Sequence, residues 1–168
     1  DSCGAISRTA DGSGRIALSG STAGTDCTTP GVGGAGNTRA ARTQFFHLNR
    51  ASDMAWGWLP TNPWVLSQLT ANTNLNQTCN AFWDGSAVNF FRSGGGCANT
   101  GELPGVSIHE WGHGLDSNDG DPTLYEYGTG ETYGDWTAAL VMRGSCTGQG
   151  FRAGNCGGYG NPCTACTG

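Results

Sequence analysis

The chain has 168 residues, a net charge of -5, 12% charged residues and 30 glycines. This length fits a single domain over residues 1–168, and the acidic balance argues against a nucleic-acid partner. No apolar run is long enough to span a bilayer, so we expect no membrane association.

Eight cysteines in so short a chain are typical of an oxidising compartment, and they predict a secreted, loop-rich protein stapled by disulfides. The sequence opens without a leader-like segment, which we interpret as the mature form of a secreted chain. Cys79 and Cys97 bracket an aromatic segment, and Cys3 and Cys27 bracket a polar one. We expect both pairs to be bonded.

The first half of the chain predicts short strands and turns over residues 1–37, followed by a helix. This helix is expected from Thr38 to about Trp56, because helix formers continue without Gly or Pro and apolar residues recur at helical spacing. Its expected apolar positions are Ala41, Phe45, Leu48 and Ala55.

The second half predicts extended structure over residues 80–91, with a turn at Asp84-Gly85. A helix is expected to begin near Pro104, and a polar loop follows from Asp116 to Pro122. Another helix is expected from Gly130 to Arg143, with Trp136, Ala139 and Leu140 at helical spacing and Gly144 after its end. Together these elements predict an α+β fold.

The expected helix after Pro104 carries the sequence His109-Glu110-Trp111-Gly112-His113, an HExxH motif. Residues four apart share a helix face, so both imidazoles can reach one zinc ion. Glu110 follows the first histidine and can take a proton from a water held at the metal, which is the role of a general base. Two of the three histidines of the chain lie in this motif.

A catalytic zinc site needs a third protein ligand, and three acidic residues compete for this role. We favour Glu131, on the expected second helix, with Asp135 one turn later as the partner of a zinc histidine. Asp119 falls at the spacing of an HExxHxxGxxD pattern, but Asp116 stands where that pattern has glycine. Asp135 itself is the third alternative.

HExxH followed by Glu131 and Asp135 resembles the thermolysin and fungalysin metallopeptidases. Residues 80–86, with the sequence Asn-Ala-Phe-Trp-Asp-Gly-Ser, are similar to the substrate-binding edge strand of that family. The resemblance covers about residues 38–142 and implies an active-site helix, a glutamate helix and this strand. It also implies that the side chain of Asn80 and the carbonyl of Ala81 bind the substrate backbone.

The chain departs from this family after the second helix, where only a Cys/Gly-rich tail over residues 143–168 follows. The C-terminal lobe of the family is therefore reduced or missing, together with its transition-state histidine. Tyr125 and Tyr127 are candidate donors to the oxyanion in its place. The polar loop after the first of these helices has two interpretations, a calcium site and a solvated turn. The candidate calcium ligands are Asp116, Asn118, Asp119 and Asp121.

The function expected from these residues is secreted, zinc-dependent endopeptidase activity, with a peptide or protein as substrate and a monomeric chain. The alternative is a non-catalytic zinc-containing binding module, or an inactive fragment of a larger protease. Retention of Glu110 favours catalysis, because a structural zinc site has no use for a base.

Overall fold

The computed structural model of the chain describes residue 13 and residues 38–120 and 129–152. Within these residues it contains three α-helices, one short 3-10 helix and one three-stranded sheet. The expectation of mixed helix and sheet is therefore confirmed. The short strands expected over residues 1–37 lie outside the described part, as do Cys3 and Cys27.

Helix α1 (Arg39–Trp58) begins where the sequence predicts, because the hydroxyl of Thr38 accepts a hydrogen bond from the N–H of Ala41 at 3.3 Å. Its buried stripe differs from the expected one, since Phe45 is exposed and Gln44 is buried. The side-chain NH2 group of Gln44 donates to the carbonyl of Gly101 and the hydroxyl of Ser107, so both of its N–H groups find tertiary partners.

The sheet has the order β1-β3-β2, with β1 (Thr70–Leu75) parallel and β2 (Ala81–Trp83) antiparallel to the central strand β3 (Ala87–Phe91). All residues of β3 are buried. The hairpin between β2 and β3 confirms the turn expected at Asp84-Gly85, where Gly85 has a φ of 94°. Strand β2 forms one edge of the sheet.

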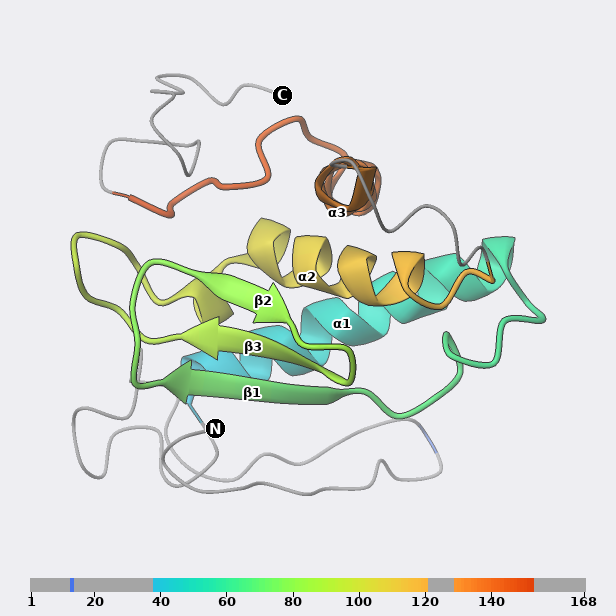
Figure 1. Cartoon of the computed structure of the whole chain (residues 1–168), viewed down its shortest axis with the longest axis horizontal. Helices are drawn as coiled ribbons and strands as arrows, with labels where there is room; N and C mark the ends of the chain where they lie inside the picture. Colours follow the sequence, from blue (N-terminus) through green and yellow to red (C-terminus); the bar gives the residue numbers. More distant parts are fainter. Residues whose placement is uncertain (1–12, 14–37, 121–128, 153–168) are drawn as a thin grey trace.

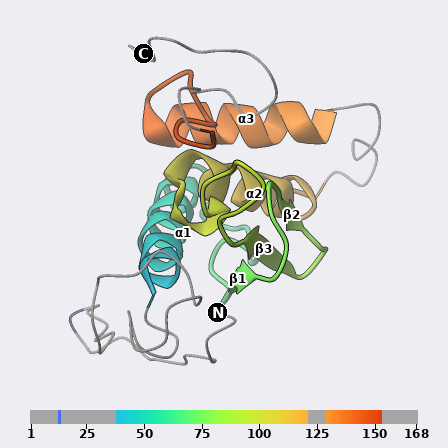
Figure 2. The same cartoon turned by 90° about the vertical axis from the view of Figure 1, so that its left-hand side faces the viewer.

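Helix α2 (Pro104–Asp116) lies at the centre of the fold, after the 3-10 helix η1 (Thr100–Glu102). It contacts α1 and the sheet, and α3 (Thr129–Met142) lies across its other side (Figures 1 and 2). Pro104 starts α2 as expected, because a proline has no N–H to leave unpaired in a first turn. The main core is built around this helix from Ile108, Trp111, Leu115, Val88, Phe90 and Leu48.

Helix α3 ends at Met142, close to the expected boundary, but a different residue provides the turn. Arg143 takes the left-handed conformation, with a φ of 57°, and the N–H of Gly144 donates to the carbonyl of Ala139 at 3.1 Å. Arg50 of α1 donates to the carbonyl of Val141 at 3.0 Å. This bond ties the end of α3 to the rest of the core.

A disulfide joins Cys79 and Cys97, which confirms one of the two expected pairs. Cys79 lies just before β2, and Cys97 lies in the loop between β3 and η1, so the bond joins these two parts of the chain. Cys146 is also disulfide-bonded. These bonds are compatible with an extracellular protein. Among the described helices, none combines the length and the apolar character needed to cross a membrane.

Candidate metal centre

Two helices bring three potential ligands together, and the expected trio is the one found. His109 and His113 of α2 meet Glu131 of α3, and their ligand atoms all lie within 4.8 Å of one another. Within the described residues, no other group of three His, Cys, Asp or Glu residues meets this condition. Asp119, the rival at the HExxHxxGxxD spacing, does not join the two histidines.

The spacing of these ligand atoms fits a tetrahedral zinc ion. The Nε2 atoms of the histidines are 3.0 Å apart, and Glu131 oxygens lie 3.3 Å from His109 Nε2 and 3.7 Å from His113 Nε2. An ion about 2.0–2.1 Å from each of three tetrahedral ligands would hold them roughly 3.3 Å apart. Two imidazoles and one carboxylate are also a ligand set that zinc accepts. The site is therefore compatible with a metal ion.

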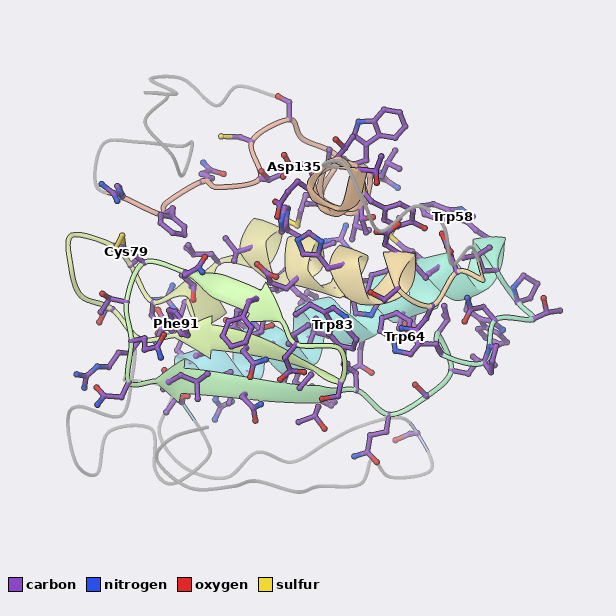
Figure 3. The ribbon with its side chains drawn as sticks, in the orientation of Figure 1. Trp58, Trp64, Cys79, Trp83, Phe91 and Asp135 are labelled. Carbon is purple, nitrogen blue, oxygen red and sulfur yellow. A yellow bond between two sulfur atoms is a disulfide. The ribbon has the colours of Figure 1, made fainter. Side chains whose placement is uncertain are left out.

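Asp135 faces the other nitrogen of His109 and is not one of the three grouped candidate ligands. Its Oδ1 lies 2.9 Å from His109 Nδ1. When Nδ1 carries the proton and donates a hydrogen bond to this carboxylate, Nε2 keeps a free lone pair directed at His113 and Glu131. Figure 3 shows Asp135 on α3, which lies above α2 in this view. This is the supporting position expected from the sequence.

Two glycines allow the helices to approach closely enough for this arrangement. A Cβ atom at Gly112 would lie 2.9 Å from the Cα of Gly134. A Cβ at Gly134 would also lie 2.9 Å from ring atoms of His109. A larger side chain at either position would push α2 and α3 apart. The two histidines would then lie farther from Glu131. Sequence reasoning gave these glycines no role.

Glu110 is buried next to the three candidate ligands, on the side of α2 that faces the edge strand. Burial, and then the charge of Glu131, raise the pKa of its carboxyl group to about 8 in the metal-free chain. The backbone N–H of Trp83 donates a hydrogen bond to this carboxyl and opposes the rise. A cation held by Glu131 would remove the second of the two causes. The pKa of Glu110 would therefore be lower with a cation bound than without one.

His113 is less readily protonated than an ordinary histidine, which suits a metal ligand. Burial lowers its pKa first and the neighbouring His109 lowers it further, against the opposing charges of Glu131, Asp116 and Asp135. A neutral imidazole leaves a lone pair available for coordination.

The edge strand lies beside Glu110. Because the N–H of Trp83 points toward Glu110, it faces away from β3, and the backbone groups of Ala81, two residues earlier, face the same free edge. The side chain of Asn80 is exposed, and its carbonyl accepts a bond from Thr100 at 2.9 Å. Trp83 packs edge-on against Trp64, below α2 in Figure 3. The two expected substrate-binding residues therefore lie at the same edge as the candidate base.

The other expected site residues lie at the end of α2 or outside the described part of the chain. Asp116, Asn118 and Asp119 follow one another at the end of α2, but the side-chain amide of Asn118 donates to the carbonyl of Gly114 at 2.7 Å and so caps the helix. Burial and the charge of Asp119 raise the pKa of Asp116. The calcium site expected in this loop stays a prediction, because one of its four residues lies outside the described part of the chain. Asp121, Tyr125 and Tyr127 lie outside the described residues.

Comparison of the chain with known protein families, with curated proteins and with solved structures finds no match.

Proposed function

We propose that the chain is a secreted zinc-dependent endopeptidase, related to the thermolysin and fungalysin group that its motifs resemble. The observation that carries the proposal is the meeting of His109, His113 and Glu131 beside the buried carboxyl of Glu110. A purely structural site would not need an acid–base group next to it, and structural zinc sites normally have four protein ligands.

Zinc, when bound, polarises a peptide carbonyl and lowers the pKa of a water bound to it from 15.7 to about 7. Glu110 takes the proton of the attacking water and then gives it to the leaving amine. The N–H of Trp83 holds the carboxyl of Glu110 in place during both transfers. Asp135 orients His109 and keeps the proton on the nitrogen that faces away from the metal.

An extended peptide would add to the free edge of β2. In this mode, the main chain of the substrate pairs with the strand and the binding does not depend on its side chains. The backbone groups of Ala81 face this free edge, and the exposed residue Asn80 precedes it in the chain. The scissile bond would then lie beside Glu110.

Three Glu→Gln variants test the proposal by zinc content and casein hydrolysis. Glu110→Gln should retain zinc and lose about 10²–10⁴-fold in activity, because the amide cannot accept a proton. Glu131→Gln should lose both zinc and activity, since an amide is a weaker, uncharged ligand. Glu102→Gln is the matched control, since Glu102 lies on η1 with Arg39 at 3.7 Å, and should retain both.

The outcomes separate the possible functions. Full zinc occupancy in Glu131→Gln would refute the ligand assignment. Stoichiometric zinc in an unmodified chain that hydrolyses neither casein nor a peptide library would favour the alternative, a non-catalytic zinc-containing module.

A further inference from the structure

The segment after α3, residues 143–152, runs back over the start of α2 to the other end of the fold (red tube in Figure 1). Its far end is anchored, because Phe151 packs with Cys97 and Leu103, and its carbonyl accepts from the N–H of Ala98 at 2.9 Å. Its near end contains the disulfide-bonded Cys146. We call residues 143–152 the strap.

The middle of the strap lies directly on α2. A Cβ atom at Gly105 would collide with the backbone carbonyl of Thr147, so glycine is required for this close contact. Because Phe151, four residues further on, packs with Cys97 and Leu103, the strap is held at that end and keeps Thr147 over α2.

Thr147 reaches from the strap to the metal centre. Its hydroxyl lies 3.3 Å from Oδ1 of Asp135, and the same oxygen lies 2.9 Å from His109 Nδ1. The side chain of Asp135 is 59% exposed, so without a second contact it is free to rotate toward solvent. The hydroxyl of Thr147 is in a position to favour the rotamer that meets His109.

We propose that Thr147 is a positioning residue for the metal ligand His109, acting through Asp135, and that the strap holds it in place. The expected effect on zinc affinity rests on the proposed function, whereas the contacts from Thr147 to Asp135 and from Asp135 to His109 are present without a metal. Hydrogen bonds from groups behind a metal ligand fix its tautomer and orientation, and their loss weakens the metal. The anchored strap extends this effect to a residue outside both site helices.

Zinc affinity, measured by competition with a chromogenic chelator, tests the proposal. Thr147→Val removes the hydroxyl at nearly constant shape, and we expect about 2- to 10-fold weaker zinc binding, less than the roughly 10- to 100-fold loss expected when a group behind the ligand is itself replaced. Thr147→Ser retains the hydroxyl and should bind like the unmodified chain. Ser145→Ala removes an exposed hydroxyl of the same strap and is the matched control.

A double-mutant cycle shows whether the effect passes through Asp135. In an Asp135→Ala background, Thr147→Val should have no further effect on zinc affinity, because the contact that it removes is already absent. An equal loss in both backgrounds would overturn the proposal, and so would a Thr147→Ser variant as weak as Thr147→Val.

Imidazole ¹⁵N NMR of the chelator-treated protein gives a readout that needs no metal. The Nδ1-protonated tautomer of His109 should be less populated in Thr147→Val than in the unmodified chain. Failure of the unmodified chain to bind zinc would refute the proposed function, and the tautomer comparison would still decide the role of Thr147. An unchanged tautomer population would overturn that role.

Discussion

Gly112 of α2 and Gly134 of α3 are in backbone contact, since a Cβ atom added to Gly112 would lie only 2.9 Å from the Cα of Gly134. This contact lies at the level of the candidate metal centre. Each helix contributes ligands one turn or less from this contact: His109 and His113 on α2, and Glu131 on α3. The separation of the helices therefore sets the separation of the ligands.

Gly134→Ala should weaken zinc binding, because its Cβ would press on the ring of His109. We expect a cost of about 1–3 kcal/mol in unfolding free energy, as for other overpacked positions, and a lower zinc occupancy. Gly57→Ala on α1 is the control, since nothing lies within 4 Å of its added methyl group. It should stabilise the chain by about 0.4–1 kcal/mol and leave zinc binding unchanged. Urea unfolding and metal analysis measure both quantities, and full zinc affinity in Gly134→Ala would contradict the close-contact argument.

Asp135→Asn should lower zinc affinity about 10- to 100-fold without abolishing it. The amide retains the shape of the side chain but is a weaker, uncharged acceptor for His109 Nδ1–H. Chelator competition measures the change. If Asp135 were instead a direct ligand, as one sequence alternative has it, this variant would lose zinc and Glu131→Gln would retain it.

Replacing both Cys79 and Cys97 by alanine should destabilise the chain by about 2–4 kcal/mol. The bond closes a loop between residues 18 apart in sequence, and opening it gives the unfolded chain more conformational freedom. Urea unfolding with and without the two substitutions measures the loss. A loss of less than about 1 kcal/mol in unfolding free energy would contradict this expectation. It would mean that the unfolded chain is restricted to a similar extent without the disulfide.

Asp84 should give the chain a pH-dependent stability below pH 4. A hydrogen bond from Asn89, and then bonds from Ala87 and Ser86, lower the pKa of its carboxyl group from 3.8 to about 2. Because the folded pKa is the lower one, the contribution is complete above pH 4 and is lost as the pH falls toward 2.

Asp84→Asn should therefore destabilise the chain at pH 7, and the difference from the unmodified chain should shrink between pH 4 and pH 2. Asp53→Asn, an exposed position of α1, is the matched control and should show no such trend. Unfolding curves at pH 7, 5 and 3 provide the comparison, and a difference independent of pH would contradict the role of the carboxylate.

Local sequence patterns were sufficient to predict α1, the hairpin and α2, because their signals depend on neighbours in the chain. Thr38 caps α1, Gly85 allows the turn, and Pro104 starts α2. The HExxH spacing placed two histidines on one face by helix geometry alone. The sequence also favoured Glu131 over Asp119, and the structure brings Glu131 to the histidines.

The buried face of α1 was predicted only in part, at Leu48 and Ala55, and that of α3 was not, because burial depends on which partner a helix meets. Apolar spacing favoured Phe45 on α1 and Trp136 and Leu140 on α3, yet all three are exposed. The buried residues of α3 are instead Gly134, Thr137, Ala138 and Val141, and the first two lie against Gly112 of α2.

Contacts between distant parts of the chain were decided by the tertiary structure alone. Gln44 is buried because Gly101 and Ser107 accept its hydrogen bonds. Thr147 meets Asp135 because the strap crosses α2 at Gly105. No periodicity or motif encodes such a meeting, since the hydrogen bond forms only after both segments have packed on the same helix. The sequence by itself thus determined which groups can do the chemistry, and packing determined how they are held.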